Sequence, residues 1–424
     1  MSLRKLNTIS YVFYFQLVTS AIVASLLLAT GKLDYHHYTD PLSYDVKVKS
    51  WAWVMYSILA MPLGMLFINR LFKVRPIIDF SSYINKEIII PKPNKYLNLI
   101  IISILVFSVL VLWYIIEKSV AIPLFSLIKG DVDLASKQRV LVRYEFGGIE
   151  YFRSFFGFML IPIFSYYLFV VAYVKKRIFY ILAFVIQFGF TAFIFLYDIQ
   201  KAPIVFYLIG YIVLITFLKG GISRKQLLFF GGFSLVIILA AYQITTGESA
   251  FRLFYEYDSA FYGRVFLTGY FAFPLSLELF PDVITEPTYY SGIPTAILNY
   301  FDIENIESAR RLMMYMNPEG VENGTANLFS GYYLAEAWAN YGYAGLIISP
   351  IIVGCVVQTV HAYLLKNPKE VLVISFYTFI TVKWLLGAGV VSFVFLKIII
   401  YPFVFYYIIK KCLHFGQKYF LKVS

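Results

Sequence analysis

The chain has 424 residues, of which 60% are hydrophobic and 14% are charged. Such a composition is too apolar for a water-soluble protein, whose surface must be solvated, and it favours an integral membrane protein. The formal net charge of +12 at pH 7 could suggest a nucleic-acid partner. However, the basic residues lie in short clusters between apolar segments and form no single patch, so nucleic acid is not expected. The two cysteines predict neither a disulfide framework nor a thiol-ligated metal site.

Apolar segments long enough to cross a bilayer recur along the whole chain. A helix needs about 20 apolar residues to span a hydrocarbon core, and a helix satisfies its own backbone amides there. We therefore expect an all-α, polytopic membrane protein with about ten transmembrane helices, forming a single integral membrane domain over residues 1–424. The expected spans are 9–30, 51–72, 97–116, 152–174, 178–197, 203–218, 227–243, 341–364, 371–387 and 390–409.

The charges between these spans predict the orientation of the chain. If the N-terminus is cytoplasmic, every short basic segment falls on the cytoplasmic side, as the positive-inside rule requires. The first span lacks a convincing cleavage site, so we expect an uncleaved signal anchor. Both termini are then cytoplasmic, and the chain is a multi-pass membrane protein. The inside segments are 1–8, 73–96, 175–177, 219–226, 365–370 and 410–424.

Residues 244–335 form a large extracytoplasmic loop in this arrangement. The loop has no lysine, four arginines and eleven acids, and thus a net charge of about −7. The apolar stretch 262–280 within it favours a re-entrant or interfacial helix, because an eleventh crossing would invert every later basic cluster. Long structured loops on a rigid scaffold commonly carry function, so we expect the functional site here.

The arginines of this loop are candidates for binding a diphosphate. A guanidinium has five donors in a planar fork and remains charged, which suits phosphate oxygens. The alternative is an ordinary ion pair with a glutamate three or four residues away on a helix. The candidates are Arg252, Arg264, Arg310 and Arg311.

Three lysines near the outer ends of the spans extend this hypothesis. Lys201 opens the sixth span, Lys383 lies near the end of the ninth, and Lys397 lies in the first half of the tenth. A charge in the hydrocarbon costs roughly 2.5–3.5 kcal/mol, so such a residue usually faces a cavity or a partner. We expect a joint anion site with Arg264; snorkelling of the lysines to the headgroups is the alternative.

Glu336 is the candidate acid or base, because it lies where the acidic loop re-enters the membrane. A carboxylate half-buried among aromatic rings can exchange a proton with a sugar hydroxyl. A carboxylate stabilised by the helix start is the alternative. No histidine lies in the loop and no zinc, nucleotide or dinucleotide motif is visible, so neither a metal nor another cofactor is expected.

Three passages carry a resemblance to a known family. Ile122-Pro123-Leu124-Phe125 opens an outside loop that ends in Gly147-Gly148, and Gln200-Lys201-Ala202-Pro203 begins a span. The third passage, Asn323-Gly324-Thr325-Ala326-Asn327, leads to Glu336 and Asn340-Tyr341-Gly342-Tyr343-Ala344-Gly345. With its overall layout, the chain resembles bacterial O-antigen or capsular repeat-unit polymerases of the Wzy class. These are related to O-antigen ligases and to multi-spanning lipid-linked-sugar glycosyltransferases.

The resemblance implies a metal-independent glycosyltransferase. Its substrate would be an oligosaccharide repeat unit on undecaprenyl diphosphate, and its product a surface polysaccharide such as the O-antigen of lipopolysaccharide or a capsule. The basic candidates named for anion binding would hold the diphosphate, with Arg264 also acting in catalysis, and Glu336 would be the general base. The neighbouring Trp338, Asn340 and Tyr341 would contact the glycan, and the chain would lie in a bacterial inner (cytoplasmic) membrane. Membrane lipids, a chain-length regulator and a flippase are the other partners implied.

Three other functions stay open at this point. A flippase or transporter predicts more spans, short loops and inverted repeats, which the sequence does not show. An O-antigen ligase would rely on a loop histidine. A classical lipid-phosphate-sugar transferase would place its acids in the first outside loop, where Asp34, Asp40 and Asp45 are present.

Overall fold

The structure, a computed structural model, describes residues 5–32, 38–91, 95–229, 231–232, 235–236, 239, 269–285, 298, 300–303, 306–322, 326, 329, 331–383 and 399–423. This part of the chain is helical and contains two isolated β-bridges, Ile89 with Glu370 and Ser119 with Phe146. Two stretches inside spans are π-helical, η1 and η2. The elements are α1 (Thr8–Tyr11), η1 (Val12–Ile22), α2 (Val23–Ala29), α3 (Tyr44–Phe72), α4 (Pro76–Asn85), α5 (Lys95–Lys118), α6 (Pro123–Ile128), α7 (Val132–Tyr144), α8 (Glu150–Phe152), η2 (Arg153–Leu160), α9 (Ile161–Lys175), α10 (Ile178–Leu196), α11 (Lys201–Lys219), α14 (Ala272–Leu279), α16 (Ser308–Met316), α17 (Pro318–Glu322), α18 (Tyr333–Lys366), α19 (Val371–Lys383) and α20 (Tyr401–Val423).

Seven helices in the described residues are long and apolar enough to cross a membrane. They coincide with the first six predicted spans and with the predicted span 341–364, which confirms a polytopic, all-α membrane protein. These helices are Thr8–Ala29, Tyr44–Phe72, Lys95–Lys118, Glu150–Lys175, Ile178–Leu196, Ala202–Lys219 and Tyr333–Lys366.

The other three predicted spans are followed only in part. Most of 227–243 lies outside the described residues. The predicted span 371–387 contains α19, whose described helix has 13 residues. The predicted span 390–409 is described from residue 399, and its helix α20 continues to Val423, well beyond the expected end. The prediction of ten spans is therefore supported for seven of them.

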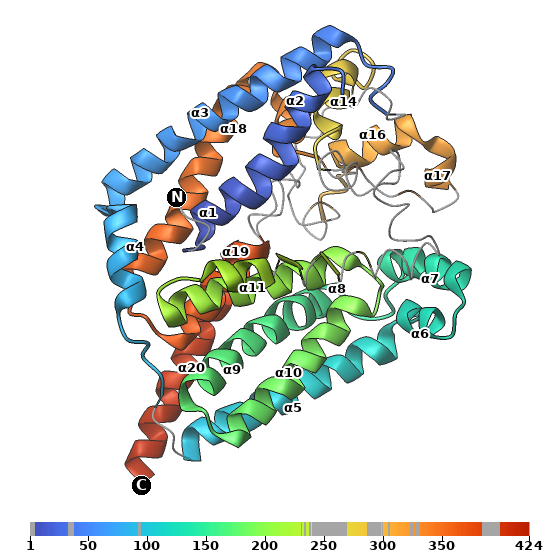
Figure 1. Cartoon of the computed structure of the whole chain (residues 1–424). Helices are drawn as coiled ribbons and strands as arrows, with labels where there is room; N and C mark the ends of the chain where they lie inside the picture. Colours follow the sequence, from blue (N-terminus) through green and yellow to red (C-terminus); the bar gives the residue numbers. More distant parts are fainter. Residues whose placement is uncertain are drawn as a thin grey trace.

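The helices form two sets that join at one end of the molecule (Figure 1). One set contains α1 to α3, α14 and α16 to α18, and the other contains α5 to α11, α19 and α20. At the junction, the Thr8 hydroxyl of α1 is 2.7 Å from the Thr381 hydroxyl of α19, and the Tyr377 hydroxyl accepts a hydrogen bond from the Thr8 backbone amide at 2.8 Å. These polar contacts between buried groups tie the two sets together.

Glycines bring α3 and α18 into close backbone contact. A Cβ on Gly64 would overlap the Ile351 carbonyl oxygen, and a Cβ on Gly354 would overlap the Met61 carbonyl oxygen. Small residues allow this approach between membrane helices, where packing and hydrogen bonds drive association. The contact fixes the position of α18, the helix that carries Glu336.

Polar pairs set the register between the same two helices. The Tyr56 hydroxyl of α3 donates to the Ile347 carbonyl at 3.1 Å, and the Gln358 amide of α18 donates to Asn69 at 2.6 Å. Because these pairs lie on either side of the glycine contact, α3 and α18 run parallel.

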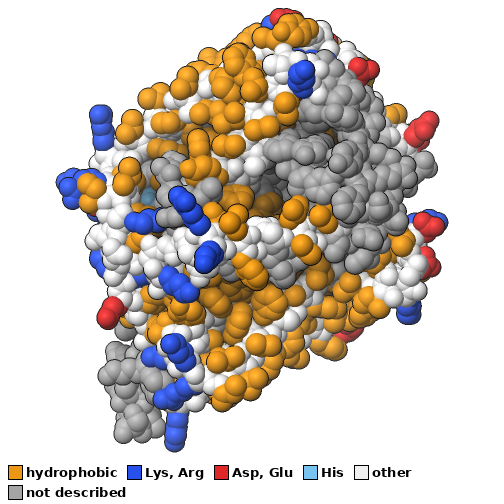
Figure 2. Space-filling view, viewed as in Figure 1, with side chains coloured by type: hydrophobic (Ala, Val, Ile, Leu, Met, Phe, Trp, Pro, Cys, Tyr) orange, Lys and Arg blue, Asp and Glu red, His pale blue; other side chains and the backbone are white. Residues whose placement is uncertain are grey.

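Charge separates along the molecule. Figure 2 shows most of the visible Lys and Arg side chains towards one end, and most of the visible Asp and Glu side chains towards the opposite end. At the first of these ends, the Lys369 ammonium donates to the carbonyls of Ile84 and Lys86, each at 2.6 Å, and Glu370 forms an ion pair with Lys410 at 3.5 Å. We call the end that carries Lys369 the basic end, and the opposite end the acidic end.

The glycine contact generates a prediction about stability. Replacing Gly354 with Ala places a methyl group on the Met61 carbonyl oxygen, so the helices must separate, and overpacking of this kind typically costs about 1–3 kcal/mol. The matched control is Gly189→Ala on α10, where the new Cβ meets nothing within 4 Å. We expect a lower thermal unfolding midpoint for Gly354→Ala alone, measured on purified protein in detergent. Equal midpoints for the two variants would contradict the close contact.

Candidate functional site

The turn between α10 and α11 presents a carboxylate at the acidic end. Asp198 accepts hydrogen bonds from the Gln200 backbone amide at 3.3 Å and from the Gln200 side chain at 2.6 Å. Ile199 between them has a left-handed backbone with φ of 54°, which makes the turn tight. Burial raises the pKa of the Asp198 carboxyl. Asp198 was not predicted from the sequence, although a single acid between two apolar spans is a visible signal.

Two passages that carry the family resemblance meet at this turn. The backbone amide of Leu124, at the start of α6, donates to the Tyr197 carbonyl at 3.1 Å. Gln200 and Lys201 follow directly, and Lys201 is the first residue of α11. The side chain of Lys201 lies outside the described part. The hydrogen bond therefore joins segments that are more than 70 residues apart in the chain.

Arg153 connects several helices next to this turn. Its guanidinium is buried and forms an ion pair with Glu150 at 2.6 Å, and it donates to the Val142 carbonyl at 3.1 Å and to the Tyr197 hydroxyl at 3.2 Å. It also lies 4.5 Å from the centre of the Phe146 ring. These contacts hold α7, η2 and the end of α10 together, so we assign Arg153 a structural role. No sequence pattern indicated it.

Lys383 ends α19 and reaches the same turn. Its ammonium lies 4.9 Å from the centre of the Phe195 ring and 5.9 Å from the Phe379 ring, so it rests against aromatic faces. Asp198 is close enough to interact with it electrostatically. Among the described residues, Lys383 forms no salt bridge within 4.0 Å. A half-buried ammonium with a nearby carboxylate and spare donors is able to receive an anion.

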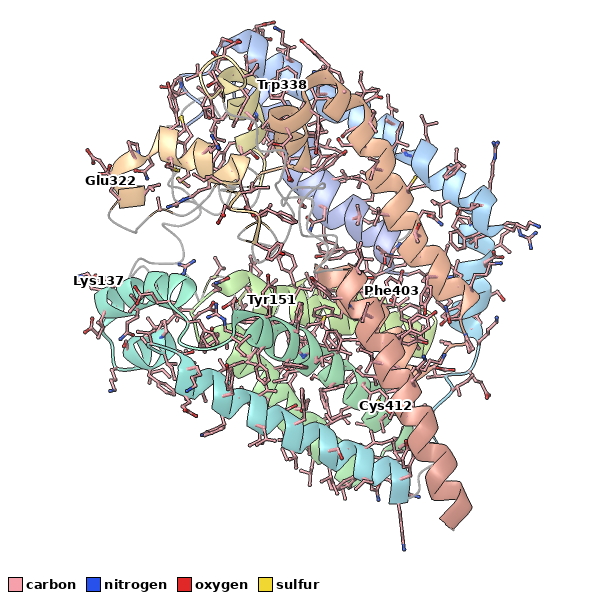
Figure 3. All side chains as sticks on the ribbon, turned by 180° about the vertical axis from the view of Figure 1, so that it is seen from behind. Lys137, Tyr151, Glu322, Trp338, Phe403 and Cys412 are labelled. Carbon is pink, nitrogen blue, oxygen red and sulfur yellow. The ribbon has the colours of Figure 1, made fainter. Side chains whose placement is uncertain are left out.

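The arginines of α16 use backbone carbonyls as partners. Arg310 donates to the Ala326 carbonyl at 3.1 Å, and Arg311 donates to the Ile306 carbonyl at 3.3 Å. Both side chains are half-buried and make further interactions. Figure 3 shows that Glu322, the last residue of α17, and Lys137 of α7 lie at the same end of the molecule, with Cys412 at the other. The α16 arginines and the α10–α11 turn therefore belong to the same end of the two helix sets.

Glu336 lies in the first turns of α18 and is buried, at 7% exposure. Asn340, one turn later on the same face, is 4% exposed. The helix breaks directly after them, because Gly342 has φ of 54° and ψ of −137°. A Cβ on Gly345 would overlap the Ala337 carbonyl oxygen. The break thus depends on glycine at two positions and leaves the buried carboxylate on a short, separate helical segment.

Trp338 and Tyr341, the two aromatic candidates next to Glu336, differ in how accessible their rings are to a ligand. The indole N–H of Trp338 donates to the Phe280 carbonyl at 3.0 Å, and its ring contacts Tyr343 edge-on at 5.1 Å. Tyr341 is 42% exposed. A sugar could therefore meet the Tyr341 ring, whereas Trp338 contributes to packing on the loop segment that follows α14.

Three of the predicted site residues, Arg252, Arg264 and Lys397, lie outside the described residues. The predicted joint anion site also included Lys201 and Lys383. The structure places Lys383 and the backbone of Lys201 next to the α10–α11 turn. Within the described ranges, no group of three or more His, Cys, Asp or Glu side chains could hold a metal ion.

No family model, curated protein or solved structure matches the chain. Its function must therefore be inferred from the residues themselves and from the resemblance carried by the three sequence passages.

The brace formed by Arg153 makes a second prediction. Arg153→Gln removes the charge-assisted hydrogen bonds to Glu150, Val142 and Tyr197, and bonds of this kind contribute about 1.5–3 kcal/mol each. We expect a lower unfolding midpoint than for Arg139→Gln, which alters an exposed arginine of α7. The two midpoints are compared by heating the detergent-solubilised variants and measuring the remaining folded protein by size-exclusion chromatography. An Arg153→Gln variant as stable as Arg139→Gln would contradict the structural role.

Proposed function

We propose that this chain is a metal-independent membrane glycosyltransferase. It joins oligosaccharide repeat units carried on undecaprenyl diphosphate into a surface polysaccharide, O-antigen or capsule, on the extracytoplasmic face of the bacterial inner membrane. The resemblance of three sequence passages supports this proposal, and so does the meeting of two of them at the α10–α11 turn through the Leu124 to Tyr197 hydrogen bond.

The observation that carries the proposal is the environment of Lys383. An ammonium within an apolar bundle costs free energy unless a partner or a cavity compensates it. Lys383 has two aromatic rings, Asp198 nearby, and no salt bridge among the described residues. Its three N–H donors suit the oxygens of a diphosphate at the outer membrane surface.

The proposed reaction has a nucleophile, the acceptor hydroxyl, and a leaving group, undecaprenyl diphosphate. A hydroxyl of the acceptor sugar attacks the anomeric carbon of the donor, and a new C–O bond forms. The bond from that carbon to the diphosphate oxygen breaks, and undecaprenyl diphosphate leaves with the electron pair. Fixed positive charge stabilises the departing anion. The acceptor hydroxyl loses its proton to a general base.

Named residues fill these roles in the proposal. Lys383 contacts the diphosphate, and Asp198 is a positioning residue that orients the Lys383 ammonium. Glu336 is the candidate base, since its carboxylate is buried beside the break in α18. Tyr341 offers an exposed ring for a sugar. The second set of diphosphate ligands in the proposal is Arg252, Arg264, Arg310, Arg311, Lys201 and Lys397.

The proposed partner proteins follow from placing the reaction on the extracytoplasmic face of the membrane. A flippase must bring the lipid-linked repeat unit to the outer face, and a chain-length regulator would end polymerisation. Both remain part of the proposal and depend on the extracytoplasmic placement of the acidic end.

Replacing Lys383 tests the proposal in cells. Lys383→Gln keeps much of the side-chain volume but removes the charge that would stabilise the diphosphate, and loss of one such donor typically slows the chemical step about 100-fold or more. In a deletion strain expressing the variant, we expect single repeat units on the cell surface but no long polysaccharide on gels. Lys366→Gln, an exposed lysine at the basic end of α18, is the control and should restore long chains. Long chains from Lys383→Gln at normal expression would remove this residue from the mechanism.

A further inference from the structure

An apolar groove of about 580 Å³ lies between α5 and α20, away from the proposed catalytic region. Its floor is made by η2, α9 and α19. The lining side chains are almost all aliphatic or aromatic; they include Ile100, Phe107, Leu160, Phe164, Phe405 and Ile409. Because the surrounding helices α5 and η2–α9 are of membrane-spanning length, this groove faces the hydrocarbon of the bilayer.

The groove occupies the half of the bundle nearest the basic end. On α5 it extends from Tyr96, the second residue of the helix, to Phe107, about halfway along. Eleven residues of helix correspond to about 16 Å, roughly half of a hydrocarbon core. Across η2 and α9 the lining runs from Phe156 to Tyr167, and Tyr167 is the lining residue nearest the basic Lys175. The depth therefore corresponds to one leaflet, the one at the basic end.

A polar group beside the groove is unpartnered. Tyr167 lines the groove, and its hydroxyl is buried behind the lining with no hydrogen-bond partner in the part of the chain that the structure describes. Tyr96 is close enough to interact with it electrostatically, but the Tyr96 hydroxyl donates to the Leu413 carbonyl at 2.6 Å. A buried hydroxyl without a partner is costly, so Tyr167 points to a ligand that brings an acceptor oxygen into an apolar setting.

Basic residues lie close in sequence to the lining residues at the end of the groove next to Tyr96. Lys95 precedes Tyr96, Lys411 lies two residues before the lining residue Leu413, and both are exposed. Arg177 directly precedes α10, and the start of α10 is close by, since Tyr180 donates to Asn98 of α5 at 3.2 Å. These three side chains form no salt bridge within the described ranges. The mouth of the groove is thus positively charged.

We propose that this groove holds an acyl chain of an anionic glycerophospholipid from the leaflet at the basic end. The chain would lie along α5, an ester carbonyl would accept the Tyr167 hydrogen bond, and the phosphate would face Lys95, Lys411 and Arg177. Charge complementarity selects this occupant. The isoprenoid diphosphate of the proposed reaction would present its charge at the acidic end, so the lipid site is separate from that reaction.

Native mass spectrometry of the purified full chain tests this site. The probes are phosphatidylglycerol and phosphatidylcholine with identical acyl chains, each added to delipidated protein in detergent. Ser103→Trp fills the groove, and Ile102→Trp, on a neighbouring exposed position of α5 outside the groove, is the matched control. Tyr167→Phe keeps the shape and removes only the hydroxyl.

We expect one phosphatidylglycerol retained by the wild type and by Ile102→Trp, and none by Ser103→Trp. Tyr167→Phe should weaken retention about fivefold, the effect of one hydrogen bond. Phosphatidylcholine should be lost at the collision energy that leaves phosphatidylglycerol bound. Equal retention of the two lipids, or undiminished binding by Ser103→Trp, would overturn the proposal. If Ser103→Trp does not purify as a monodisperse species, Tyr167→Phe decides, and unchanged retention by it counts against the site.

Discussion

Close contact between the backbones of α3 and α18 governs how the rest of this membrane protein is arranged. Inside a bilayer, apolar side chains gain little by leaving lipid for protein, so helices associate through packing and internal hydrogen bonds. Gly64 and Gly354 permit that packing, and the Gln358 to Asn69 bond fixes the register. Everything at the far end of α18, including Glu336, takes its position from this pair of helices.

The second set of helices is ordered around a polar turn. Arg153 joins three elements, and the Leu124 amide closes the α10–α11 turn by bonding Tyr197. This rigid turn places Asp198 near Lys383, and Lys383 is held against Phe195. A fixed cation at the acidic end of the bundle needs no reorganisation when an anion arrives, which is the condition for stabilising a leaving diphosphate. The two sets thus each supply one part of the proposed chemistry, charge from α19 and a carboxylate from α18.

The lipid groove follows from the same construction. α5 and α20 do not close over η2 and α9, and their apolar side chains leave an open groove, in which we propose that a lipid acyl chain lies. Its position at the basic end separates it from the proposed catalytic region.

Features that depend on local composition could be predicted from the sequence. Long apolar runs located seven spans, because a helix crossing a bilayer needs about 20 apolar residues wherever it lies in the fold. Glu336 and Lys383 were also identified, because a charge beside an apolar run is conspicuous. The helices α6 and α7 in the loop 117–151 were missed, since their mixed composition gave no clear period.

Features that arise from contacts between distant segments could not be predicted from the sequence. Arg153 is ordinary in sequence, and only its neighbours Val142 and Tyr197 reveal the brace. Asp198 acquires its significance from Lys383, which lies 185 residues later. The break in α18 was equally hidden, since Gly342 is one glycine among 25 until its backbone conformation is known.

Reconstitution of the purified chain in liposomes with a synthetic repeat unit on undecaprenyl diphosphate tests the central claim most directly. The account predicts products that contain two, three and more repeat units on one lipid, with one undecaprenyl diphosphate released for each new glycosidic bond and no added metal required. The Lys383→Gln variant should release little or no undecaprenyl diphosphate. Movement of the intact lipid-linked unit between leaflets without any new bond, or elongation that proceeds equally well in Lys383→Gln, would contradict it.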